Sequence, residues 1–268
     1  MIEQIISRRL QIPLHQVQGT VCLLREGATI PFISRYRKEA TGSLDELQVG
    51  AVKEQLDKLT ELEARKQTVL STIGEQGKLT DELRKRIEAC WEAVELEDIY
   101  LPYKPKRRTR ATVARERGLE PLANSIMAQH SHDIARQAQR FVTADVPTPE
   151  EAIAGACDII AERVSEDERA RNSVRRTAAR EGTVHSRLVK GKEQEGVKYS
   201  DYFDAASPLR TVSSHRFLAM RRGMDEGVLK ISVEMDADRI TEGLCRQFVR
   251  HGSATREWME AAVADSFK

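Results

Sequence analysis

Residues 43–70, SLDELQVGAVKEQLDKLTELEARKQTVL, carry the strongest structural signal in the sequence. Apolar side chains recur there every three or four residues, the spacing of one helix face, at Val49, Val52, Leu56, Leu59 and Leu62. Charged side chains fill the opposite face, which is typical of a surface helix. Ser43-Leu44-Asp45-Glu46 has the form of a capping box, so we predict a long amphipathic helix that begins there, runs to about Leu70 and is broken by residues 74–78.

Similar patterns predict helices on both sides of this stretch. Asp81–Val94 is expected to return beside the long helix as the second arm of an antiparallel hairpin. Thr148-Pro149-Glu150-Glu151 combines a Thr cap, Pro at the first helical position and Glu at the third, and predicts a helix to Val164. Ser165–Glu168 has the form of another capping box, which predicts a basic helix that ends near Gly182.

The last third of the sequence mixes strand and helix patterns. Thr183–Lys190 and Val228–Met235 alternate between apolar and polar residues, as half-buried strands do, although the sequence leaves their pairing open. Ser214–Arg222 predicts a short helix closed by Gly223. Residues 237–250 and 253–268 predict two further helices that turn at His251-Gly252.

The composition agrees with a helical chain. Of 268 residues, 40% are hydrophobic and only 5% aromatic, and Gly (15) and Pro (8) are sparse, whereas a β-sandwich or barrel needs frequent turn residues. We predict a mainly α fold of two parts: a multi-helix region with helical hairpins over residues 1–182, and a mixed segment over residues 183–268. A minor β element is expected near 183–190 and 228–236.

Several protein classes are excluded by the same numbers. No apolar run approaches the ~18 residues of a membrane span, and the N-terminus lacks the apolar core of a signal peptide. The 4 Cys are scattered singly without a CxxC spacing, so we expect no disulfide framework, no zinc site and a reduced, cytoplasmic setting. With 43 Lys+Arg against 42 Asp+Glu, only local charge clusters can indicate nucleic-acid binding.

The clearest basic cluster holds five basic side chains within seven positions, Lys104, Lys106, Arg107, Arg108 and Arg110. Pro102 and Pro105 hold this stretch out of helix, so the side chains are displayed on a stiff, extended segment that can neutralise phosphates. Tyr100 or Tyr103 could stack on a base. The alternative is that the segment pairs with the acidic run at residues 92–98 and bridges helices by salt bridges.

Two further basic sets carry the same ambiguity. In the predicted helix after Ser165, Arg169, Arg176 and Arg180 share a face approximately, which fits either a phosphate-facing stripe or a solvated helix face. The third set is Arg35, Arg37 and Lys38. It is expected to pair with nearby acids, and the alternative is a phosphate or partner site.

Enzyme signatures are weak throughout. The two glycines of Gly191–Lys198 have P-loop spacing, but Val197 stands where the lysine belongs and the segment is highly charged. No carboxylate pair or metal-ligand spacing stands out. We therefore expect no catalytic residue, no metal and no cofactor.

Three collinear segments together resemble one protein family. LREGATIPFISRYRKEATG (residues 24–42) is similar to the signature GATVPFIARYRKEATG, and LEDIYLPYKPKRRTRAT (96–112) to LEDLYLPYKPKRRTRA. Tyr202-Phe203-Asp204, SHRFLAMRRG (214–223) and EGVL (226–229) resemble YFD, SHRVLALNRG and EGVL in the same order. The chain thus resembles the N-terminal region of the bacterial Tex proteins, which are cytoplasmic transcription accessory proteins.

The resemblance implies a larger architecture than this sequence contains. Tex proteins open with a helical region that includes a helix-turn-helix-like unit, which we expect among the helices of residues 183–268. An RNase H-like YqgF domain, helix-hairpin-helix elements and a C-terminal OB-fold RNA-binding domain follow. No helix stop signal follows the last apolar position, so we expect an N-terminal portion, cut before the YqgF domain.

Two functional hypotheses follow, with an enzyme such as a nuclease as the third. The first is a non-enzymatic module that binds RNA or DNA without sequence specificity through the basic segment, with RNA polymerase as a further partner. The second is a scaffold that packs against the downstream YqgF and OB-fold domains or RNA polymerase and binds no nucleic acid itself. The sequence leaves open the choice between RNA and DNA, the transcription partner and the oligomeric state.

Overall fold

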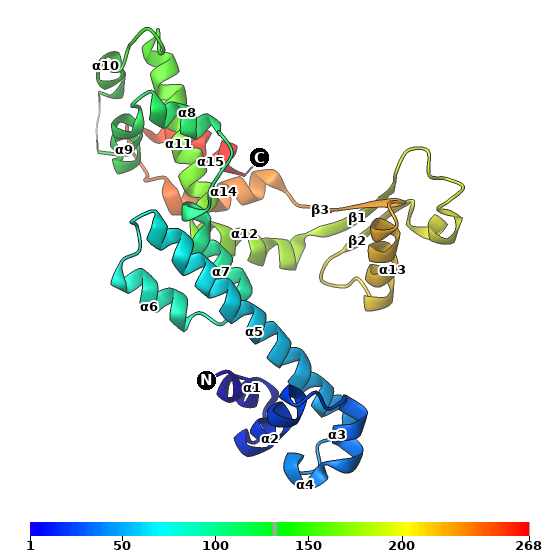
Figure 1. Cartoon of the computed structure of the whole chain (residues 1–268). Coiled ribbons are helices and arrows are strands. Elements are labelled where there is room, and N and C mark those ends of the chain that lie inside the picture. The colour runs from blue at the N-terminus through cyan, green and yellow to red at the C-terminus, as the bar shows by residue number, and fades with distance from the viewer. Residues whose placement is uncertain (131–132, 268) are drawn as a thin grey trace. The chain divides into compact units, whose positions relative to one another are not determined.

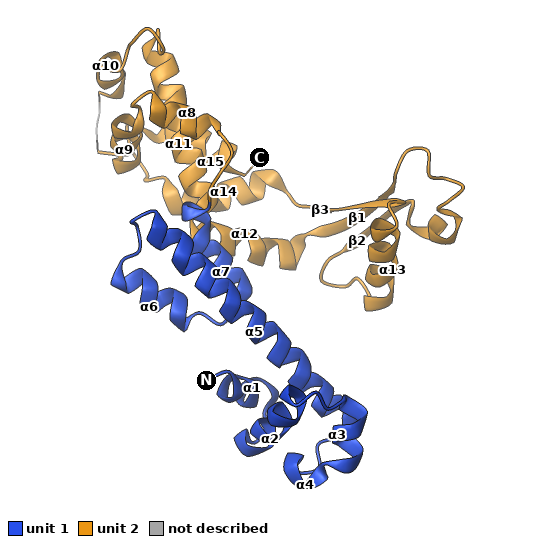
Figure 2. Ribbon diagram, in the orientation of Figure 1, with its two compact units in different colours: residues 1–104 blue, residues 105–268 orange. Residues whose placement is uncertain are grey.

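The computed structural model describes residues 1–130 and 133–267 and is mainly α-helical, with one small β element (Figure 1). The chain divides into two compact units, Met1–Lys104 and Pro105–Lys268, which are coloured separately in Figure 2. The mainly α fold class is therefore confirmed. The boundary at residue 182 falls inside the second unit, between a helix and a strand, and stays a prediction.

In the first unit, one long helix supports the others. Its elements are α1 (Ile2–Leu10), α2 (Leu14–Arg25), α3 (Ile30–Tyr36), α4 (Lys38–Thr41), α5 (Glu46–Glu75), α6 (Asp81–Ala89), α7 (Ala93–Tyr100) and the 3₁₀ turn η1 (Leu101–Tyr103). Helices α1, α2, α3, α6 and α7 all pack on α5. The buried side chains of α5 include all five of the predicted apolar positions, so the helical period in the sequence correctly identified the core face.

The two ends of α5 differ from the prediction. The helix runs to Glu75 rather than Leu70, and its capping box is formed by Asp45 and Gln48 rather than by Ser43 and Glu46. The Asp45 carboxylate accepts a 2.7 Å hydrogen bond from the Gln48 amide, and the Gln48 side chain accepts one from the Asp45 amide at 3.1 Å. Ser43 lies instead in the left-handed region at φ 66°, one residue after Gly42.

The predicted helix over Asp81–Val94 is two helices in the structure. Residue Cys90 adopts an extended conformation (φ −75°, ψ 130°) and ends α6, and α7 begins at Ala93. Cys90 is buried, and its thiol donates to the carbonyl oxygen of Glu92. The apolar period continues through the break, which is why the sequence did not reveal it.

In the second unit, helices surround α11, as Figure 1 shows. The helices are α8 (Arg110–Glu116), α9 (Glu120–Ala128), α10 (Ile134–Gln139), α11 (Pro149–Glu166), α12 (Glu168–Glu181), α13 (Ser214–Asp225), α14 (Ala237–Phe248) and α15 (Arg256–Ser266), with the 3₁₀ segment η2 (Val197–Tyr202). Helices α8, α9, α10 and α15 pack on α11, whose Ile159 and Ile160 are fully buried. The Thr148 cap and Pro149 start of α11 are confirmed.

The start of α12 corrects another predicted cap. Helix α11 continues through Ser165 to Glu166, and the Asp167 carboxylate caps α12 by accepting a 2.9 Å hydrogen bond from the Ala170 amide. The Ser165 hydroxyl donates back to the Glu162 carbonyl oxygen at 2.8 Å. Only Asp167 thus separates the two helices.

The small sheet contains both predicted strands and one that was missed. Strands β1 (Thr183–Leu188), β2 (Asp204–Pro208) and β3 (Leu229–Glu234) pair in the antiparallel order β2-β1-β3. Val184 pairs with Val233 across β1 and β3. Helix α13 packs on β3 and runs past Gly223 to Asp225 rather than ending there. Glycine fits that position because a Cβ would lie 2.5 Å from Leu229 Cδ1.

No helix in the described residues is long and apolar enough to cross a membrane. The same residues contain no cluster of three or more His, Cys, Asp or Glu side chains arranged to hold a metal ion.

Candidate nucleic-acid interface

Helix α12 carries the densest basic face of the second unit. Its 14 residues contain five arginines and two glutamates. Arg169, Arg176 and Arg180 are exposed and line a groove of about 670 Å³ between α12 and the end of α14. The shared face that the sequence indicated for these three arginines is therefore present, and α14 supplies the opposite wall.

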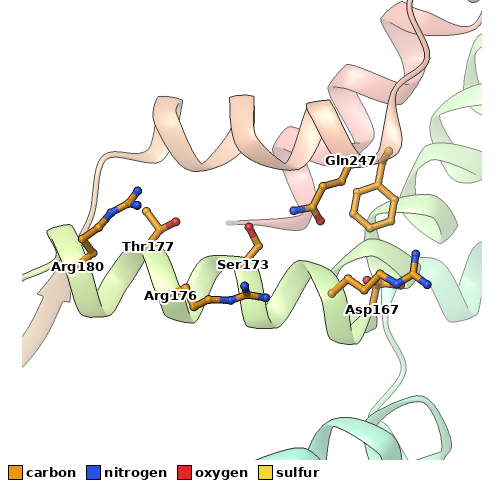
Figure 3. A pocket seen from close by; sticks show the side chains of 8 residues that line it. Asp167, Ser173, Arg176, Thr177, Arg180 and Gln247 are labelled. Atoms are coloured by element: carbon orange, nitrogen blue, oxygen red, sulfur yellow. The ribbon is translucent and has the colours of Figure 1, made fainter.

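The groove also offers neutral hydrogen-bonding groups. Ser173 and Thr177 of α12 and Gln247 of α14 line it, together with Phe248. In Figure 3, Ser173 and Thr177 point from α12 toward α14, and Gln247 points back toward them. Hydroxyl, amide and guanidinium groups in one groove are the set that proteins use to hold phosphate oxygens.

The charges of the groove arginines are only partly neutralised. Arg169 forms no ion pair with any described residue, and Arg176 donates from Nε to the Asn172 carbonyl oxygen at 3.3 Å. Arg180 pairs with Glu181 at 2.8 Å, but Glu181 also pairs with Arg239 of α14 at 2.9 Å. Asp167 is the acid in the groove lining. The groove thus has an excess of positive charge.

The segment that the sequence singled out, Lys104–Arg110, is largely engaged with acids. Lys106 contacts Glu166 and lies 3.3 Å from Glu162, both on α11. Arg108 pairs with Glu116 at 2.7 Å. Arg110 pairs with Asp158 at 3.4 Å and with Asp265 at 2.5 Å.

Glu162 anchors this segment to α11. Its carboxylate forms an ion pair with Arg115 at 2.6 Å and accepts a hydrogen bond from the Thr109 hydroxyl at 2.9 Å, and the side chain is only 11% exposed. Burial acts to raise the pKa of Glu162, but the interactions with Arg115 and Thr109 and the charge of Lys106 outweigh it and hold this pKa below its ordinary value. Thr109 also caps α8 through the Thr112 amide.

Two residues of the segment keep free charges. Lys104 and Arg107 are exposed, and neither forms an ion pair with a described residue. In the acidic run at residues 92–98, Glu97 accepts two hydrogen bonds from Arg65, at 2.7 and 3.1 Å; these, with a smaller contribution from the charge of Lys104, hold the pKa of Glu97 below its ordinary value. The salt-bridge alternative thus describes Lys106, Arg108 and Arg110, but with acids of α8, α11 and α15.

The contact between Lys106 and Glu166 brings two of the predicted basic sets together. Glu166 is the last residue of α11, and α12 begins two residues later. The extended segment is therefore tied to the corner from which the arginine face of α12 starts. The third set, Arg35, Arg37 and Lys38, lies in the first unit, where Arg37 pairs with Glu39 at 3.6 Å.

Comparison with known families accounts for most of the chain. Residues 1–74 match the family model of the Tex-like protein N-terminal domain, and residues 129–268 match the Tex central region-like model. The chain belongs to the Tex family. The resemblance carried by the three sequence segments is thereby confirmed.

Relatives of this Tex chain agree with the family match. It is 46% identical over 237 residues to the transcriptional accessory protein Tex of Neisseria gonorrhoeae, covering 88% of this chain and 31% of the relative. It is 45% identical over 270 residues to the protein YhgF of Escherichia coli K12, covering 99% and 35%. More distantly, it is 26% identical over 255 residues to human S1 RNA-binding domain-containing protein 1, covering 92% and 26%. The Tex chain thus spans about a third of the length of its bacterial relatives.

Sequence reasoning missed part of this interface. Gln247 and Phe248 of the Tex chain lie about 70 residues beyond the arginines that they face, and nothing in their local sequence indicates which helix lies opposite. The basic character of α12 was visible, but the groove depends on the packing of α12 against α14.

Proposed function

We propose that this chain is a non-enzymatic nucleic-acid-binding module of a transcription accessory protein, and that the α12 groove contacts the sugar-phosphate backbone. The observation that carries the proposal is the excess positive charge of Arg169, Arg176 and Arg180 in a groove with neutral hydrogen-bond donors. Contacts of this kind are independent of base sequence and weaken with salt because they release counterions.

The basic segment contributes less to this site than the sequence alone suggests. An arginine already paired with a carboxylate must give up that partner, or share it, to bind a phosphate, so Arg108 and Arg110 start at a disadvantage. Lys104 and Arg107 have no such partner among the described residues. They are the members of the segment that we assign to phosphate contact.

Family membership supports the setting of this proposal. The Neisseria relative is named a transcriptional accessory protein and the human relative an S1 RNA-binding domain-containing protein. We propose that this chain acts in the cytoplasm beside RNA polymerase on an RNA or DNA strand. The helix-turn-helix-like unit is assigned to α14 and α15, which pack against each other and are joined by residues 249–255.

A scaffold role is the second candidate. It is favoured by one observation: the chain corresponds to about a third of its bacterial relatives, whose remaining length could pack on its surface. In that case the basic groups would meet acids of those parts, and the isolated chain would bind no nucleic acid.

A charge-matched pair of variants separates the two candidates. The first variant carries Arg169→Gln, Arg176→Gln and Arg180→Gln, and the control carries Arg136→Gln, Arg140→Gln and Arg221→Gln, three exposed arginines of the same unit outside the groove. Both lose the same charge. Binding to a fluorescent RNA strand at low salt should weaken about tenfold in the groove variant and about twofold or less in the control. Equal losses in both, or no binding by the parent chain, would contradict the proposal.

A further inference from the structure

Helix α3 presents two aromatic side chains outward. Gly27, at φ 87°, ends the turn after α2, and Pro31 stands in the first turn of α3. Ile33 is fully buried, on the side where α3 packs on α5. Phe32 and Tyr36 are spaced i,i+4, so their side chains are neighbours on the surface of α3, and both are exposed.

These two rings are exposed and held together. Phe32 is 41% and Tyr36 69% exposed, and their ring centroids lie 5.7 Å apart with the planes tilted by 43°. The guanidinium of Arg37 lies 5.8 Å from the Phe32 centroid, within reach of a cation–π contact. The rings therefore form a small ordered platform rather than two separate side chains.

The charges beside the platform are mostly positive. Arg35 and Lys38 are exposed and form no ion pair with a described residue. The single acid in the stretch, Glu39, pairs with Arg37 at 3.6 Å. An apolar partner surface would leave these cations without counter-charges, whereas a phosphate backbone would neutralise them.

We propose that Phe32 and Tyr36 stack on the bases of single-stranded nucleic acid, while Arg35 and Lys38 contact the adjacent phosphates. Aromatic faces flanked by cations are the usual platform for single strands, because every base has a π-face. Bases in a duplex are already stacked on one another and do not reach such a platform. This inference rests on the proposed nucleic-acid binding of the chain and gives the first unit its own contribution, which is preference for single strands.

The test compares single-stranded and duplex binding of the full 268-residue chain. The probes are a fluorescent oligo-uridine strand, an oligo-thymidine strand of equal length and a DNA duplex. The test variant carries Phe32→Ala and Tyr36→Ala. Leu47→Ala, at a residue of the same unit that is 84% exposed, controls for loss of exposed apolar surface, and Phe32→Tyr with Tyr36→Phe preserves both rings.

The proposal predicts a selective loss. The alanine pair should weaken binding to both single strands about tenfold or more, since stacking contributes about 1–3 kcal/mol per base, and should leave duplex binding within about twofold. The Leu47 control and the ring-preserving variant should bind like the parent. Equal losses for strand and duplex, or no loss for either, would overturn the stacking role.

Failure of this inference is distinguishable from failure of the proposed function. If the groove variant loses affinity and the alanine pair does not, the α12 interface stands and the α3 platform is rejected. If the alanine pair keeps its strand affinity but no longer binds the separately produced remainder of the Escherichia coli relative, the platform is a contact between parts of the longer protein, which also rejects it.

Discussion

The ammonium group of Lys66 lies 3.4 Å from the centroid of the Trp91 ring. Lys66 is only 1% exposed, and its Nζ also donates to the Glu88 carbonyl oxygen at 2.9 Å and lies 3.5 Å from Glu63. A buried cation is costly unless it is paired, so the ring, the carbonyl and the carboxylate together offset its desolvation. This arrangement connects α5 to the break between α6 and α7.

Removing the ring should therefore cost more than removing the charge. Trp91→Leu leaves the Lys66 ammonium without its aromatic partner and should lower the free energy of unfolding by about 2–4 kcal/mol. Lys66→Met keeps the side-chain volume without the charge and should change it by about 1 kcal/mol or less. The midpoints of urea unfolding measure both. A larger loss for the methionine variant would mean that the charge itself stabilises this corner.

Two glycines of the first unit should respond to alanine with opposite signs. A Cβ at Gly19, in α2, would lie 2.0 Å from the backbone oxygen of Ala40, so Gly19→Ala must separate two backbone segments and should destabilise by about 2 kcal/mol or more. Gly50, in α5, has no atom within 4 Å of such a Cβ, so Gly50→Ala should stabilise by about 0.5–1 kcal/mol through helix propensity. Thermal unfolding distinguishes the signs, and a destabilised Gly50→Ala would contradict this packing.

Glu162 should make the second unit sensitive to acid. Its pKa in the folded chain lies below the ordinary value of 4.5, so the ionised form stabilises the fold above that pH, and this contribution is lost as the pH falls through the lowered value. Glu162→Gln should cost on the order of 2 kcal/mol at pH 7, and the difference from the parent should disappear as the pH falls through the lowered pKa of Glu162.

Glu166→Gln is the matched control for this titration. Glu166 shares Lys106 with Glu162 but lacks the contacts to Arg115 and Thr109, so its replacement should cost less at pH 7. Urea unfolding at a series of pH values measures both variants. A Glu162 effect that is independent of pH would show that the carboxylate acts through its shape and not through its charge.

The cysteines should differ in reactivity. Burial, with a smaller contribution from Asp158, raises the pKa of Cys157 to about 11, so almost no thiolate forms at pH 8. Cys90 is also buried, and burial raises its pKa. Cys22 is exposed, and the hydrogen bond to Glu26 raises its pKa without blocking access. Iodoacetamide should modify Cys22 well before Cys157 and Cys90, as peptide mass spectrometry over time would record; Cys157 reacting first would contradict this order.

Local patterns in the sequence predicted α5, α11 to α15 and two strands because those signals lie within a few residues of one another. The period of α5 and the Thr148 cap of α11 are of this kind. Strand β2 lacks alternation in its residues, Asp204–Pro208, and exists through its pairing with β1. Predicting β2 therefore requires knowledge of the strand with which it pairs, and local sequence does not supply that knowledge.

The site was harder to predict than the fold for the same reason. The basic side chains were visible, but their neutralisation depends on tertiary contacts such as Arg110 with Asp265, 155 residues apart. Gly223 likewise has the appearance of a helix stop, but α13 continues to Asp225, and the glycine makes room for Leu229, which approaches it closely. Which cations remain free is therefore a property of the packed unit.

A salt titration tests whether the α12 groove binds phosphates. The affinity of the parent chain and of the Arg169, Arg176 and Arg180 glutamine variant for one fluorescent RNA strand would be measured from about 50 to 200 mM salt. For a single strand, the slope of log affinity against log salt is about −0.7 per phosphate contact, so the variant should be shallower by about 2. Equal slopes for the two proteins would contradict the assignment of the groove.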